Sequence, residues 1–168
     1  MPVFAGFTGI NTIRAAKVMR LMGVEELQRV KDEVALNTMQ AYFDVVYYTE
    51  SVRLAREQLE TSTGNLAKSR KLLELGLKSA ADVAEQEAQC ASDDYLLTQQ
   101  ENNLELARIT LAETMNYPPD RPLGIETDLA IETPAGTAPF SDVVAYALDN
   151  NPKARSAGYN VRQSKLQY

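Results

Sequence analysis

The spacing of hydrophobic residues predicts a single very long helix over residues Asn11–Leu75. Apolar side chains recur three and four positions apart, and no proline occurs between Val3 and Tyr117. Gly23 and Gly64 each cost about 1 kcal/mol relative to alanine, which is too little to interrupt so long a run. At 1.5 Å per residue, a helix of about 65 residues spans roughly 95 Å. The pattern therefore predicts a rod rather than a compact domain.

The second half of this rod carries a heptad seam, in which the inward positions alternate at spacings of three and four. The members of the seam are Val52, Ala55, Leu59, Ser62, Leu66, Ser69 and Leu73. The seam is thin because two of its members are serine. A seam of this kind predicts a second helix alongside, with a left-handed supercoil.

A returning helix is expected over residues Ala80–Asn116, where the same alternation continues. Its inward positions, several of them polar, are Val83, Gln86, Cys90, Asp93, Leu97, Gln100, Leu104, Ala107, Leu111 and Thr114. Ala84, Ala88 and Ala91 form a second stripe of small residues. Two weak seams suit a helix with a neighbour on each side, as in a wall of packed helices.

The residues between these helices predict a tight reversal, with its tip at residues 75–80. Gly76 can take the left-handed backbone that ends a helix. Ser79 is a good N-cap, and Asp82 stands where a capping box places its returning carboxylate. Stop and start signals this close together predict an antiparallel helical hairpin. The simplest interpretation of Gly76 and Ser79 is structural capping, on which a function can be superimposed.

The C-terminal third differs in character. A proline-rich stretch after Tyr117 ends the second helix. Ser141 is expected to cap a short helix over residues 142–149. Between them, an alternating run predicts one short strand, whose apolar side comprises Ile125, Thr127, Leu129 and Ile131.

The two ends of the sequence carry further elements. Asn151 before Pro152 predicts a helix start, since asparagine caps well and proline suits the first helical position. The inward positions expected in that helix, which runs over residues 153–168, are Ala154, Ala157, Val161 and Leu166. Residues 1–10 alternate weakly, like the end of an extended strand. Since that strand has no partner and the last helix has no cap, both ends are expected to be cuts in a longer protein.

Composition and charge narrow the range of functions. The chain has 168 residues and a formal net charge of -6, which disfavours nucleic acid as a partner. It has no histidine, and so lacks the commonest metal ligand and the commonest general base at neutral pH. Its one cysteine, Cys90, is expected to be a small buried side chain. No apolar run reaches the roughly 20 residues of a membrane-spanning helix, and no signal-peptide pattern is present.

No catalytic, cofactor-binding or metal site is expected. The candidate carboxylates of the returning helix are Glu85, Glu87, Asp93 and Asp94. Glu85 and Glu87 are two positions apart, and Asp93 and Asp94 are adjacent. The two members of each pair therefore point to different sides of a helix. Gly6 and Gly9 lack the lysine and the third glycine of a phosphate-binding loop. The sequence therefore argues against an enzyme.

Charge separates the two arms of the hairpin. The returning helix has Arg108 as its cation, and its acids are Asp82, Glu85, Glu87, Asp93, Asp94, Glu101, Glu105 and Glu113. The cations on the facing part of the first helix and at the tip are Arg53, Arg56, Lys68, Arg70, Lys71 and Lys78. Cross-arm ion pairs are expected, each contributing about 0–1 kcal/mol. The acidic face is either a solvated surface, which is the simpler interpretation, or the lining of a water-filled conduit.

Five segments follow one another in a recognisable order. They are Pro2-Val-Phe-Ala-Gly, Ala41-Tyr-Phe-Asp-Val, Leu75-Gly-Leu-Lys-Ser-Ala-Ala-Asp-Val, Asn103-Leu-Glu-Leu-Ala-Arg-Ile-Thr-Leu and Ala147-Leu-Asp-Asn-Asn-Pro. Together they resemble the TolC-like outer-membrane efflux protein family, the outer membrane factors. In that family each protomer holds two such repeats and gives four strands to a trimeric β-barrel, and its long helices form a tunnel across the periplasm.

The resemblance implies a register for about one repeat. Residues 1–10 would end a barrel strand, and residues 11–116 would form the long hairpin. Residues 117–151 would be an equatorial-like segment with a short strand and a short helix. Residues 152–168 would start the second-repeat helix. The expected fold is thus dominated by α-helix, with a coiled-coil-like antiparallel hairpin, as a fragment of a channel made of an α-barrel and a β-barrel.

The resemblance also implies a function and partners. The chain would be a periplasmic part of an outer-membrane channel in a tripartite efflux or type I secretion system of a Gram-negative bacterium. Such a channel is a homotrimer and a passive exit duct for small molecules or proteins. The tip residues Gly76, Leu77, Ser79 and Asp82 would face a periplasmic adaptor and an inner-membrane pump. Contact with the outer membrane would come from barrel strands that lie outside this sequence.

Two other classes of protein share the hairpin pattern. A soluble coiled-coil scaffold would show the same seam, caps and charge, although the strand-like start argues against it. A periplasmic adaptor hairpin would be flanked by lipoyl-like β-halves, whereas residues 118–139 offer one strand.

Overall fold

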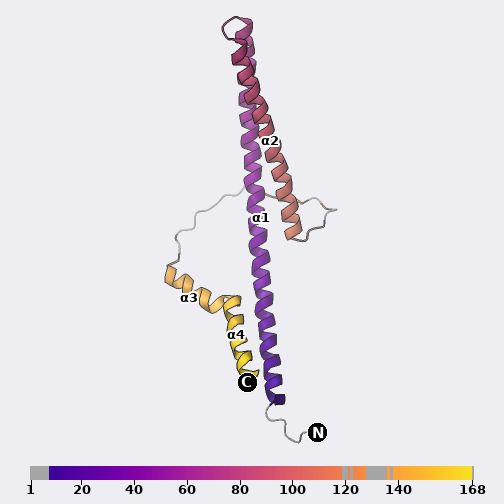
Figure 1. Ribbon diagram of the computed structural model, residues 1–168, viewed down its shortest axis with the longest axis vertical. Helices are drawn as coiled ribbons and strands as arrows, with labels where there is room; N and C mark the ends of the chain where they lie inside the picture. The colour runs from indigo at the N-terminus through magenta and orange to yellow at the C-terminus, as the bar shows by residue number, and fades with distance from the viewer. Residues whose placement is uncertain (1–7, 119–120, 122, 128–135, 137, 168) are drawn as a thin grey trace. The chain divides into compact units, whose positions relative to one another are not determined.

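Four helices form the regular secondary structure of the computed structural model, which describes residues 8–118, 121, 123–127, 136 and 138–167. In chain order they are α1 (Thr8–Glu74), α2 (Ala80–Thr114), α3 (Phe140–Asn150) and α4 (Pro152–Gln167) (Figure 1). No strand occurs within these described ranges. The predicted dominance of α-helix is therefore confirmed.

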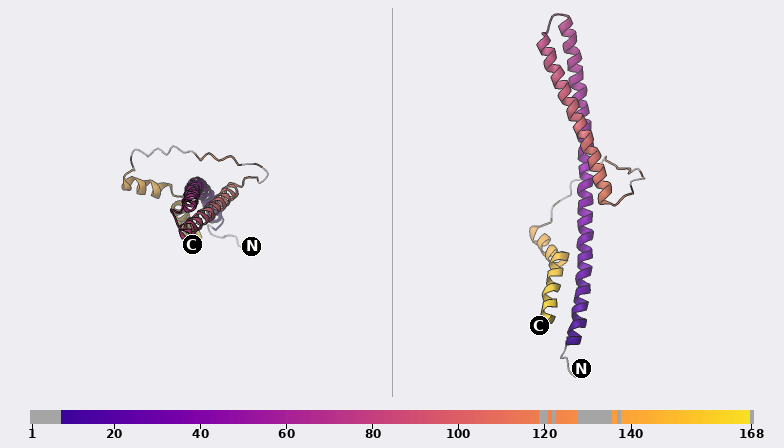
Figure 2. Two further views of the ribbon diagram at one scale, coloured as in Figure 1. Left: turned by 90° about the horizontal axis from the view of Figure 1, so that it is seen from above. Right: turned by 45° about the vertical axis from the view of Figure 1, so that its right-hand side comes forward.

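The chain divides into two compact units, and α1 contributes to both. The hairpin unit is Leu36–Leu129, and the terminal unit is Met1–Ala35 together with Ala130–Tyr168. In the hairpin unit, α2 returns antiparallel beside α1 (Figures 1 and 2). The two helices meet in the predicted manner, as a long pair joined by a short reversal.

The predicted heptad seams lie between the two arms of the hairpin unit. Every expected seam position of α2 is buried or half-buried, and so is every one in α1 except Leu73, which is 37% exposed. A cluster of buried apolar residues brings Ala41 and Val45 of α1 together with Ala107 and Leu111 of α2. Periodicity thus identified the contacting face of α2 and that of the second half of α1, whereas Ala41 and Val45 were not among the predicted positions.

The helix boundaries differ from the predicted ones at two places. α1 already begins at Thr8, so residues 8–10 are helical and do not end a barrel strand, while residues 1–7 lie outside the described part. Gly9 costs a helix only about 1 kcal/mol, and no proline occurs between Pro2 and Pro118 to stop it. α2 ends at Thr114, because Asn116 takes a positive φ of 50°. Asparagine tolerates this left-handed conformation, which ends the helix two residues before the expected point.

The segment after α2 packs against the hairpin without forming the expected strand. Residues 123–127 have no regular structure, and the remainder of the expected strand, Leu129 and Ile131, lies outside the described residues. Leu123 and Ile125 pack on the core, and the Tyr42 hydroxyl donates a 2.6 Å hydrogen bond to the Glu126 carbonyl oxygen. A strand needs a second strand to bind its backbone groups, and here a side chain of α1 binds one of them instead.

In the terminal unit, α4 runs antiparallel to the first part of α1 (Figures 1 and 2). Val18 and Glu25 of α1 are buried there, with 4% and 6% of their surface exposed. The Arg155 guanidinium of α4 lies 2.9 Å from the Glu25 carboxylate. This ion pair joins residues far apart in the sequence and was not predicted.

The start of α3 differs from the prediction, whereas the start of α4 agrees with it. α3 begins at Phe140 with Pro139 at the N-cap position, so Ser141 lies inside the helix and bonds Asp142 at 3.0 Å instead of capping it. Proline fixes φ near the value that a helix entry needs, which moves the start earlier. For α4 the expected cap is confirmed, because the Asn151 side-chain oxygen accepts from the Lys153 N–H at 2.9 Å.

The inward face of α4 is not the predicted one. Ala154, Ala157 and Val161 are exposed, and Leu166 is the predicted member that is half-buried. The half-buried positions of this helix are Pro152, Ser156, Tyr159, Gln163 and Leu166. Tyr159 buries more apolar area than Ala154 or Ala157 can. The face of α4 that carries Tyr159 is therefore the covered one, in place of the predicted alanine face.

Candidate functional site at the hairpin tip

The first helix ends at the tip through a left-handed glycine, as the sequence predicts. Gly76 has φ +72° and no atom within 4 Å of the position a Cβ would occupy. Its N–H donates to the Leu73 carbonyl at 2.9 Å, and the Leu77 N–H donates to the Leu72 carbonyl at 2.8 Å. These paired bonds form a Schellman motif, which satisfies the last carbonyls of α1. A side chain at position 76 would meet open space but would strain the backbone.

The second helix begins with a complete capping box. The Ser79 hydroxyl accepts from the Asp82 N–H at 3.2 Å, and the Asp82 carboxylate accepts from the Ser79 N–H at 2.9 Å. The same carboxylate oxygen accepts from the Ser79 hydroxyl at 2.8 Å. The capping roles predicted for Gly76, Ser79 and Asp82 are therefore confirmed.

The electrostatics of the tip favour a fully ionised Asp82. The hydrogen bonds from the Ser79 backbone and from its hydroxyl, with the nearby Lys78 charge, lower the pKa of Asp82. The carboxylate also stands at the positive end of the α2 dipole. Because the tip is open to solvent, it presents a fixed negative charge.

Lys78 was expected among the cations that pair across the arms, but it binds a hydroxyl group. Its ammonium group donates to the Ser69 hydroxyl at 3.0 Å, so it reaches back across the loop to a buried position of the α1 seam. This bond closes the loop between the two helix caps. The sequence signal was present, since Lys78 is the cation nearest to the cap, but its direction depends on the folded loop.

Two leucines project from the same reversal. Leu75 and Leu77 are each 71% exposed. With Asp82 they place apolar and acidic groups at one end of the hairpin, on a backbone fixed by two caps. Such an arrangement can bind a partner that offers an apolar contact and a basic group.

The arms below the tip are joined by ion pairs on one edge. Arg56 lies 3.1 Å from Glu101, and Arg70 lies 2.8 Å from Glu87. These are the predicted cross-arm pairs. Arg53 departs from that expectation, because it binds Glu50 and Glu57 within its own helix at 2.9 and 2.7 Å.

The seam itself contains polar groups of interest. Asp93 is 5% exposed, and one of its oxygens accepts from the Gln89 amide at 2.9 Å. Its second oxygen is buried and has no hydrogen-bond partner among the described residues. Cys90 is half-buried rather than buried, with its sulfur 3.5 Å from the Thr63 hydroxyl.

Two cavities lie at the other end of α2, beside the segment that follows it. One has a volume of about 650 Å³, and its lining includes four charged side chains, those of Glu105, Glu113, Arg108 and Arg121. The other, of about 360 Å³, is mainly apolar, and Met39, Tyr42 and Met115 are among its lining residues. In the described part of the chain, no three acidic or cysteine side chains are grouped to hold a metal ion. None of the helices, as far as they are described, has a stretch long and apolar enough to cross a membrane.

The chain was compared with family models, curated protein sequences and solved structures. No family model, no curated protein sequence and no solved structure matches the chain.

Proposed function

We propose that this chain is a periplasmic hairpin of a TolC-like outer-membrane channel, the exit duct of a tripartite efflux or type I secretion system. The proposal rests on the order of the sequence motifs, which resembles that family, and on the faces that the hairpin leaves uncovered. In this role the full-length protein is a homotrimer of a Gram-negative outer membrane. It conducts small molecules or proteins passively and carries out no chemical reaction.

The observation that carries the proposal is the second apolar stripe of α2. Ala84, Ala88 and Ala91 are exposed although the seam toward α1 is already occupied, and Tyr95 further along is 69% exposed. Small residues let another helix approach closely, and a large exposed apolar stripe marks a surface that a partner covers. A wall of helices supplies such a neighbour on each side, whereas an isolated two-helix scaffold does not.

The proposed partners would bind at the tip of the hairpin. A periplasmic adaptor and an inner-membrane pump would meet Gly76, Leu77, Ser79 and Asp82 at the end of the hairpin. The exposed Leu77 and the ionised Asp82 support this assignment, since they suit a partner with an apolar and a basic contact.

The test is the mass and location of the full-length gene product that contains this chain. We expect a membrane-embedded trimer in detergent. A soluble monomer or dimer would refute the channel and favour a coiled-coil scaffold or an adaptor hairpin.

A matched pair of variants links that result to the stripe. Ala91 lies in the stripe, and its neighbour Ser92 is exposed outside it. Ala91→Arg should place a charge in the contact and reduce the trimer, while Ser92→Arg should leave it intact. Equal trimer levels in the two variants would show that the stripe is not an interface.

A further inference from the structure

In the terminal unit, a charged residue interrupts a face that is otherwise built for close helix packing. The buried and half-buried residues of this part of α1 are Asn11, Ala15, Val18, Met22 and Glu25. They follow the same spacings of four and three as the half-buried positions of α4. Two faces with the same regular spacing can pack in more than one register, one heptad apart.

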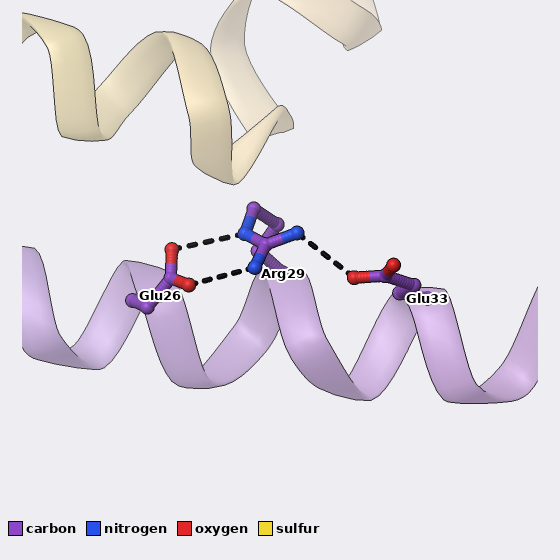
Figure 3. A network of polar contacts seen from close by, with 3 residues as sticks. All are labelled: Glu26, Arg29 and Glu33. Atoms are coloured by element: carbon purple, nitrogen blue, oxygen red, sulfur yellow. Dashed lines mark hydrogen bonds and ion pairs between the residues drawn. The ribbon is translucent and has the colours of Figure 1, made fainter.

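Glu25 obtains its partner from α4 and not from its own helix. Its side chain is 7% exposed and lies 2.9 Å from the Arg155 guanidinium. The adjacent Glu26 is different, because it is exposed and is held by Arg29, which also binds Glu33 at 2.8 Å (Figure 3). The environment of Glu25 therefore depends on where α4 docks.

The sequence of α4 offers a second arginine at the equivalent position. Arg162 follows Arg155 by one heptad, and on α1 Asp32 follows Glu25 by one heptad. If α4 moved along α1 by one heptad, Arg162 would reach Glu25 and Arg155 would reach Asp32. This shifted register would pair both arginines with carboxylates.

We propose that Glu25 selects between two registers of α4 on α1, the observed one with Arg155 and a shifted one with Arg162. A buried carboxylate without a cation is strongly unfavourable, so α4 docks only where an arginine meets Glu25. The shifted register would exchange the observed pair at Glu25 for one with Arg162 and would add a pair between Arg155 and Asp32. This inference does not depend on the proposed channel function.

The experiment measures the distance between two spin labels in the full chain, one at Ile10 on α1 and one at Val161 on α4. Both positions are exposed. Cys90→Ser removes the natural cysteine, so that the labels attach only at these two positions. The shift expected in Arg155→Met is a lengthening of up to about 10 Å, which is seven residues at 1.5 Å each. In Arg155→Met with Arg162→Met no arginine can meet Glu25, so α4 should leave α1 and the distances should spread broadly instead of lengthening by this fixed amount. Arg162→Met alone is the matched control and should keep the original distance.

Other outcomes overturn the proposal. An unchanged distance in Arg155→Met would show that apolar contacts alone set the register. Identical distances in Arg155→Met and the double variant would show that Arg162 has no role. A second route avoids an unpaired buried carboxylate, because Glu25→Gln combined with Arg155→Met removes the charge that selects the register and should show no lengthening. A lengthening that persists in this combination would show that Glu25 does not select the register.

Discussion

Asp93 is a buried side chain, and the described residues around it satisfy only one of its two carboxylate oxygens. It lies in the seam between the two arms, 5% exposed, and one carboxylate oxygen has no partner in the described part of the chain. Removing a charge from water without full compensation is unfavourable. A polar group at such a position is known to fix the register of paired helices at a cost in stability.

Replacing that carboxylate with an amide should stabilise the hairpin. Asp93→Asn keeps the shape and the contact with Gln89 but removes the buried charge. We expect the free energy of unfolding in urea, followed by circular dichroism, to rise by about 1 kcal/mol. The exposed neighbour gives the control, since Asp94→Asn should change stability by less than about 0.5 kcal/mol. A clear loss of stability in Asp93→Asn would mean that the charge has a favourable partner.

Asp82 gives a prediction about pH. Its folded-state pKa is lowered, mainly by the hydrogen bonds from Ser79. The stabilisation it provides is therefore complete above the ordinary aspartate pKa of about 4 and is lost as the pH falls through the lower folded value. The start of α2 should stay intact from neutral pH to about 4 and fray only below it.

Carboxyl chemical shifts measured during an acid titration test this directly. The midpoint of Asp82 should lie below the ordinary value and should move up in Ser79→Ala, which removes the hydroxyl. If the midpoint were the same in both proteins, the Ser79 hydroxyl would not contribute to the shift, which would then come from the backbone N–H of residue 79.

At the scale of elements, the two cross-arm ion pairs reveal a simple register. Arg56 with Glu101 and Arg70 with Glu87 are two heptads apart on each helix. Midway between them, Thr63 of α1 stands at the level of Asp94 of α2, and both are exposed. The ion-pair edge therefore has a central position without a cation.

Thr63→Arg should complete this edge. A third pair, with Asp94, is expected to raise the stability of the hairpin by up to about 1 kcal/mol, less at high salt. A double-mutant cycle isolates the effect, because the gain should vanish when Asp94→Asn is also present. A gain that survives in the double variant would assign it to helix propensity instead.

The hairpin could be predicted from the sequence because its determinants are local or periodic. Spacings of three and four located the seams, and Gly76, Ser79 and Asp82 located the reversal. Elements that depend on distant partners were not predictable. The expected strand is absent at residues 123–127, where Tyr42 binds the backbone. The pairing of Glu25 with Arg155, and with it the buried face of α4, depends on contacts that no local pattern encodes.

At the scale of the whole molecule, the tip variants separate docking from assembly under the proposed function. Gly76→Asn adds a side chain where the backbone is otherwise bare, yet asparagine accepts a positive φ. In the full-length protein we expect reduced export, seen as increased drug susceptibility, with an unchanged trimer on an immunoblot. Gly64→Asn, on an exposed position within α1, is the control and should retain export. Parallel loss of trimer and export in Gly76→Asn would rule out a docking role for the tip.

The contacts of the hairpin also define an order in which the chain can fold. Going away from the tip, the bridged residues lie 9 apart at Lys78 and Ser69, then 17, 27 and 45 apart along the arms. The bond from Tyr42 to Glu126 spans 84 residues. Closing a longer loop costs more entropy, and each contact near the tip shortens the loop that remains for the next. The pair of helices is thus suited to zip from the reversal outward, with the segment after α2 joining last.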